Sequence, residues 1–191
     1  DVSIENLGWV RYNWASNRDN LRILDEETST WEAQQYFNAG GNTIVDVTSV
    51  GLARDPQALV RISHATGLNV VMGAGNYVHM SHPPELQELS VEQIIHDIEQ
   101  GVGDTGIRSG IIGEIGCSWP WHESEKKVLE ASVIAQRETG APLLIPPGRN
   151  QRAPIDLLNA VEKWGGNLSR TVMGHIERTV YDRGILNELI G

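Results

Sequence analysis

Short apolar runs alternate along the chain with longer amphipathic segments. The runs are rich in Val, Ile and Leu and bounded by Gly, Asn or Pro, a pattern typical of buried strands. They cover 43–48, 69–73, 110–115, 142–145 and 170–174. The segments between them predict helices at 26–39, 55–66, 122–139, 153–164 and 181–190, and one more that opens at Ser90 with a capping-box pattern.

This alternation of strand and helix predicts a parallel α/β sheet. Right-handed crossovers leave two architectures, the closed (β/α)8 barrel and the open doubly wound sheet. A closed barrel usually takes about 250 residues, and this chain has 191. We therefore expect one domain over 1–191 with five βα units, either an open sheet or part of a barrel. Residues 1–25 predict a loop and a short helix ahead of the first unit.

Composition and charge narrow the class of partner. The formal net charge of −10 and the scattered Lys and Arg argue against nucleic acid and against an anionic membrane surface. A single cysteine, Cys117, predicts a reducing compartment, which we take as the cytoplasm. We expect a small-molecule substrate and leave a homo-oligomer open. The chain begins at Asp1 without an initiating Met, so we expect it to lie inside a longer gene product.

Candidate chemistry is concentrated where the predicted strands end, because ligands bind at the carboxyl ends of parallel strands. Glu114 lies in an apolar strand, and a buried carboxylate needs a partner or a metal. From position alone, a metal ligand or general base and a structural ion pair with Arg108 or Arg149 are both open. His175 follows the fifth strand and is either a metal ligand or a hydrogen-bonded strand-terminal histidine.

Other signals are weaker. The Gly-x-Gly at 73–75 lacks the third glycine of a dinucleotide fingerprint and opens a loop, so a nucleotide-binding open sheet is a minor alternative. Tyr77 is a hydrogen-bond donor at the strand mouth or a packing residue. Trp119 walls a pocket or covers the rim. His79 and His82 are expected to be solvent-exposed loop histidines, and the acids at 123–125 complement a helix dipole.

Five segments of the sequence together resemble the phosphotriesterase-related proteins of the amidohydrolase superfamily. They are GIIGEIGCSWP at 110–120, PGR at 147–149 followed by RAP at 152–154, TVMGH at 171–175, GLARD at 51–55 and GAGNY at 73–77. The segments occur in the family's order and spacing, and the resemblance extends over essentially the whole chain.

The resemblance implies a (β/α)8 barrel whose second to sixth strands are present here. It also implies a metal-dependent hydrolase with two divalent metals, expected to be zinc, and a bridging hydroxide that cleaves a small ester, amide, lactone or phosphotriester. Glu114 matches the bridging carboxylate and His175 the sixth-strand histidine ligand. Tyr77 matches a tyrosine near the bridging hydroxide in related lactonases. We assign Arg149 and Trp119 to substrate binding.

The chain departs from the family pattern at its metal ligands. The family's first-strand His-x-His pair and eighth-strand Asp are not found in it, and Pro146 occupies the position of the fifth-strand histidine. Proline has no side-chain donor atom. Two functional classes therefore remain: a hydrolase of which this chain is a fragment with little activity alone, and a non-catalytic remnant kept as a binding domain.

Overall fold

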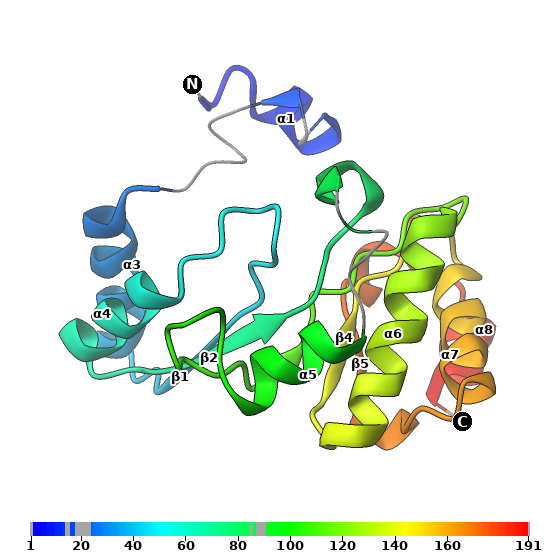
Figure 1. Ribbon diagram of the computed structural model, residues 1–191. Coiled ribbons are helices and arrows are strands. Elements are labelled where there is room, and N and C mark those ends of the chain that lie inside the picture. Colours follow the sequence, from blue (N-terminus) through cyan, green and yellow to red (C-terminus); the bar gives the residue numbers. More distant parts are fainter. Residues whose placement is uncertain (1, 14–15, 18–23, 85, 87–90, 191) are drawn as a thin grey trace. The chain divides into compact units, whose positions relative to one another are not determined.

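The computed structural model describes residues 2–13, 16–17, 24–84, 86 and 91–190, in which helices and strands alternate (Figure 1). The strands are β1 (Thr43–Asp46), β2 (Asn69–Ala74), β3 (Ile111–Ile112), β4 (Leu143–Ile145) and β5 (Thr171–Met173). The α-helices are α1 (Leu7–Tyr12), α3 (Glu26–Asn38), α4 (Pro56–Thr66), α5 (Val91–Glu99), α6 (Glu123–Thr139), α7 (Ala153–Lys163) and α8 (Arg183–Ile190). Short 3-10 turns are η2 (His79–Ser81), η4 (Leu168–Arg170) and η5 (Ile176–Arg178).

Local sequence signals explain most helix ends. Asp25 caps α3 by accepting hydrogen bonds from the backbone N–H groups of Glu27 and Thr28. The same helix ends before Gly40, whose φ of +94° suits glycine. The helix predicted at 55–66 is confirmed as α4, which begins at Pro56. The cap predicted at Ser90 lies outside the described residues.

The third strand is shorter than predicted. The expected strand at 110–115 contributes only two residues, because the backbone bends at Gly113, which has a φ of +144°. A Cβ at this position would lie 2.8 Å from the Leu144 backbone oxygen, so only glycine fits. Beyond it, the Glu114 N–H donates to the carbonyl of Val47 (3.3 Å) and the Ile115 N–H to that of Leu144 (3.0 Å). The segment that carries Glu114 is therefore held by hydrogen bonds to Val47, directly after β1, and to Leu144 of β4.

The sheet order settles the architecture. The five strands lie in the order β1-β2-β3-β4-β5, and the pairs β2–β3, β3–β4 and β4–β5 are parallel. Sequential order leaves no topological switch point of the kind a doubly wound sheet has. Successive helices α5, α6, α7 and α8 each pack against the next. This is the arrangement of a half-barrel, which confirms the predicted α/β fold class.

Two compact units share the chain. One comprises residues 1–44 and 57–70 and includes the exposed Arg61–Glu26 ion pair (2.7 Å). The other comprises 45–56 and 71–191 and holds the main core. Ile112, Leu143 and Ile145 of the sheet are fully buried there, as is Leu129 of α6. Each such side chain stabilises the fold by roughly 1.5–3 kcal/mol. No helix among the described residues is long and apolar enough to cross a bilayer.

Candidate active site

Glu114 and His175 meet at the carboxyl ends of β3 and β5. The Nε2 atom of His175 lies 3.2 Å from Oε1 of Glu114, although 61 residues separate the two in sequence. The side chain of Glu114 is 17% exposed and that of His175 40% exposed, so both remain reachable from solvent. The structure thus brings together two residues proposed from their strand positions, while their role as metal ligands stays a prediction. Glu114 thus meets a histidine here, where the sequence had left open an ion pair with Arg108 or Arg149.

The backbone of His175 is strained. Its φ of 55° and ψ of 31° place it in the left-handed region, which residues other than glycine rarely adopt. Such a conformation costs of order 1–3 kcal/mol and persists where the surrounding structure enforces it. Here it turns the chain from β5 into η5. Strained residues cluster at functional sites, which supports a role for this turn in the candidate site.

Tyr77 and Arg178 complete the same region. Tyr77 follows β2, and its ring packs so closely on the next loop that a Cβ at Gly116 would lie 2.7 Å from it. The positive charge of Arg178 acts on both Tyr77 and Glu114, which places its guanidinium in the same region. Arg178 was not among the candidate residues that the sequence indicated. Its position three residues after His175, at the end of η5, was the available signal.

Burial controls the ionisation of this group. It raises the pKa of Tyr77 to about 12, with the Glu114 carboxylate adding to the effect and Arg178 opposing it. The phenol is therefore a neutral O–H donor near pH 7. Burial also raises the pKa of Glu114, against the opposing effects of His175 and Arg178. A carboxylate whose charged form is penalised in this way is stabilised by a cation.

The donor set fits part of a metal centre. A catalytic zinc ion normally takes three protein ligands, and Glu114 with His175 offers a carboxylate and an imidazole facing each other. Elsewhere in the described ranges, as at this pair, no three His, Cys, Asp or Glu side chains are placed to hold a metal. Pro146 lies between the two strands, buried, with its carbonyl accepting from the Cys117 N–H (3.2 Å). It adds no ligand, so further donors are required.

The residues assigned to substrate binding lie on neighbouring loops. Trp119 is 41% exposed in the loop after β3. Gly148, one residue before Arg149, packs closely against Trp119. A Cβ at Gly148 would lie 2.5 Å from the backbone nitrogen of Trp119. Arg149 is exposed. The structure thus brings the two loops together and places both residues near solvent, while their contact with a substrate stays a prediction.

Glu125 is the important residue that the sequence analysis missed. Its acid group was interpreted as complementing the α6 dipole, yet its side chain is fully buried and binds two loops. His79 and His82 were expected to be plain exposed histidines. His79 is exposed as expected, although its Nδ1 lies 3.1 Å from Oε1 of Glu125. His82 is instead half-buried between Tyr77 and Ser124. The capping-box spacing of His122 and Glu125 was the available signal.

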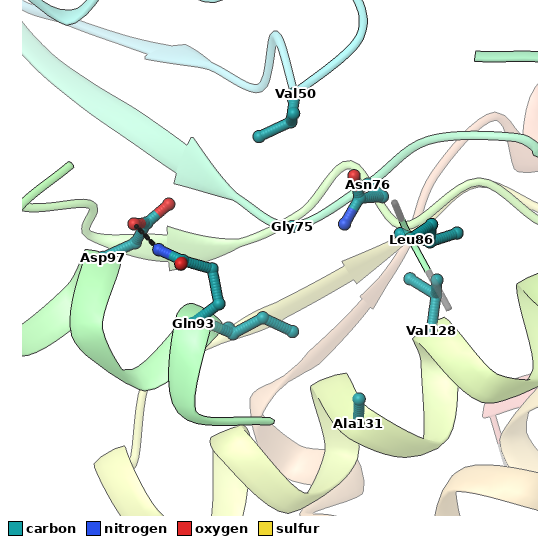
Figure 2. Close-up of a pocket in the computed structure, with 9 residues that line it drawn as sticks. Val50, Gly75, Asn76, Leu86, Gln93, Asp97, Val128 and Ala131 are labelled. Carbon is teal, nitrogen blue, oxygen red and sulfur yellow. Dashed lines mark hydrogen bonds between the residues drawn. The ribbon is translucent and has the colours of Figure 1, made fainter. Parts of the chain in front are cut away.

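A separate small cavity lies between α5 and α6 (Figure 2). Gln93 and Asp97 of α5 and Val128 and Ala131 of α6 line it, with Asn76 beyond β2. Its volume of about 30 Å³ suits about two water molecules, since one needs roughly 10–15 Å³. Asp97 is already bound to the Gln93 amide (3.0 Å). This cavity is too small for a substrate and is not the candidate site.

The chain is similar in sequence and in fold to known proteins. The chain is 43% identical over 195 residues to the phosphotriesterase-related protein of Nematostella vectensis, covering 99% of this chain and 56% of that protein. It is 41% identical over 192 residues to the N-acetyltaurine hydrolase of Homo sapiens, covering 98% and 55%. A crystal structure of a resiniferatoxin-binding protein from Rhodobacter sphaeroides superposes with a TM-score of 0.89 at 35% identity, covering 98% and 54%.

The chain spans about half the length of the curated relatives it matches. The model of the phosphotriesterase family matches residues 2–191. The nucleotide-binding alternative has no support from the sequential strand order. With the paired carboxylate and imidazole at the strand ends, these matches agree with the resemblance noted in the sequence, and the chain belongs to the phosphotriesterase family.

Proposed function

We propose that the whole protein is a metal-dependent hydrolase of small-molecule substrates. The observation that carries the proposal is the 3.2 Å approach of His175 Nε2 to Glu114 Oε1 at the carboxyl ends of β3 and β5. A divalent metal bound there, which we expect to be zinc and one of two, would acidify a water molecule and polarise the scissile bond. Since this chain supplies two donors, the remaining ligands would come from the rest of the longer protein.

The residues of this chain have distinct tasks in the proposal. Glu114 and His175 hold the cation. Tyr77, neutral because its pKa is about 12, donates its O–H to an oxygen of the substrate. Arg178 places its positive charge beside that phenol. Trp119 and Arg149 border the entrance from the loops after β3 and β4.

Arg178 also indicates a substrate class. A guanidinium carries five N–H donors in a planar fork that matches carboxylate, sulfonate and phosphate groups. The human relative is named for N-acetyltaurine, an amide that ends in a sulfonate. We infer that the preferred substrate is a small acylated amine or ester with an anionic end, bound by Arg178 while the acyl carbonyl lies at Glu114 and His175.

A second reading is a binding domain that has lost catalysis. Pro146 supports it, because this buried residue lies where the family resemblance expects a histidine ligand. The two readings differ in metal content. A hydrolase holds metal through Glu114 and His175, whereas a remnant folds without it.

The deciding experiment counts metals on the full-length protein. Elemental analysis of wild type is expected to give about two metals per folded chain, as in the two-metal centres of hydrolases, and His175→Ala should lower that number. His64→Ala, the same change at an exposed histidine of α4, is the matched control and should leave it unchanged. Hydrolysis of a panel of esters, lactones and amides is measured in parallel. A folded wild-type protein without metal or activity would favour the remnant.

Three further expectations accompany the proposal. The negative net charge of −10 supports a small-molecule partner rather than nucleic acid or a membrane. The single cysteine supports a reducing compartment such as the cytoplasm. Whether the protein forms a homo-oligomer is a question for sedimentation of the full-length chain.

A further inference from the structure

Glu125 is a fully buried carboxylate that accepts hydrogen bonds from three backbone N–H groups. Its Oε1 accepts from the N–H of His79 (3.0 Å), and its Oε2 accepts from the N–H groups of Ser118 (2.9 Å) and His122 (3.2 Å). The Ser118 hydroxyl donates as well, 2.8 Å from Oε2. Nδ1 of His79 lies 3.1 Å from Oε1. The side chain has no exposed surface.

These donors come from the two loops that carry the proposed catalytic groups. His79 follows Tyr77 by two residues in the loop after β2. Ser118 follows Glu114 by four residues in the loop after β3. Glu125 itself lies in the first turn of α6, so a single carboxylate joins both loops to one rigid helix.

The adjoining histidine strengthens the attachment of Tyr77. Nε2 of His82 lies 2.9 Å from the backbone oxygen of Tyr77 and, carrying the proton, donates to it. Its other ring nitrogen, Nδ1, then accepts from the hydroxyl of Ser124 in α6 (3.1 Å). Tyr77 is thus held by the hydrogen bond of its own carbonyl to His82. It is also held by the bond of the His79 N–H, two residues later, to Glu125.

Capping of the helix alone does not explain this arrangement. The N-terminus of α6 already has a cap, because the His122 side chain accepts from the Ser124 N–H (3.2 Å). Burying a carboxylate is costly, and here it is offset by donors that lie mostly outside the helix. The donors outweigh the effect of burial, which by itself would raise the pKa, and leave the pKa of Glu125 below its ordinary value.

We propose that Glu125 is a positioning residue that fixes Tyr77 and Glu114 relative to one another. The inference rests on the proposed hydrolase function and deepens it. Glutamine at this position keeps the shape but places an NH2 group against donors that need an acceptor. The loops then lose their common attachment while the catalytic side chains themselves remain.

The test compares Glu125→Gln with Tyr77→Phe in the full-length protein. Glu125→Gln is expected to lower kcat about 10–100-fold, the usual effect of losing a group that orients a site, with KM changed much less. The double variant should fall little below Tyr77→Phe, because both changes affect one unit. Glu130→Gln on the exposed face of α6 is the matched control and should match wild type. Full additivity in the double variant would overturn the proposal.

Hydrogen exchange separates failure of this inference from failure of the proposed function. The amides of His79 and Ser118 should exchange faster in Glu125→Gln and unchanged in Glu130→Gln, whether or not the protein is active. Faster exchange with unaltered kcat would overturn the positioning role. Unaltered exchange would overturn the attachment itself. If Glu125→Gln does not fold, Ser118→Ala, which removes only the hydroxyl contact, should give a smaller change of the same kind.

Discussion

Two carboxylates of the same half-barrel show opposite solutions to burial. Glu125 has no exposure and five donor atoms around it, and its pKa is lowered. Glu114 is 17% exposed, its hydrogen-bonding partner is His175, and burial raises its pKa. The first is satisfied by the fold. The Glu114 carboxylate still has acceptor capacity, which a bound cation or a substrate donor requires.

The strongest test of the contrast between Glu114 and Glu125 is to neutralise Glu114. In the full-length protein, Glu114→Gln should lower kcat/KM at least about 1,000-fold, a loss near 4 kcal/mol, because one of the residues that would hold the metal is altered. The free energy of unfolding should change by less than about 1 kcal/mol, since few native contacts depend on this charge. Steady-state kinetics and denaturant titration provide the two numbers. Near-normal activity would contradict the assignment of Glu114 as a metal ligand.

Substitution of Arg178 tests whether this residue binds the anionic end of the substrate. Arg178→Met should lower kcat/KM for an anionic acyl amide such as N-acetyltaurine by about 10–100-fold, the worth of a charge-assisted hydrogen bond. N-ethylacetamide, which lacks the sulfonate, should be affected far less. Competition kinetics with both substrates measures the ratio. An equal loss on the two would mean that Arg178 acts only through Tyr77.

The smallest expected effect is the dependence of stability on pH. Because the folded-state pKa of Glu125 lies below its ordinary value of 4.5, its ionised form stabilises the fold above that pH. This contribution is lost as the pH falls below 4.5 through the folded-state pKa. The gap in unfolding free energy between wild type and Glu125→Gln should therefore be constant near neutrality and shrink in acid. Urea titrations from pH 7 to pH 3 measure it, and a gap that widened in acid would contradict the assignment.

Much of the fold was predictable because its signals are local. The stop at Gly40 and the start at Pro56 depend on residues within one turn of the helix ends. The extent of the third strand was not predictable. The backbone bends at Gly113 because it approaches Leu144 closely, and Leu144 belongs to another strand. Strand composition alone cannot report such an approach.

The residues of the candidate site also divide into those that the sequence indicated and those that it did not. Glu114 and His175 could be predicted because a carboxylate and an imidazole at apolar strand ends are unusual in themselves. Glu125 could not, because acids are ordinary in the first turn of a helix. Its main partner, His79, is 46 residues earlier in the chain and contributes a backbone N–H that every non-proline residue has.

The use of backbone N–H groups by Glu125 has an evolutionary consequence. Glu125 binds the main chain at positions 79, 118 and 122, so three of its contacts do not depend on which side chains the loops carry. The loop sequences can drift, and substrate preference with them, while the attachment geometry persists. Proline at those positions would remove the N–H that Glu125 accepts from. Libraries that diversify these loops but retain Glu125 should therefore yield a high fraction of folded variants.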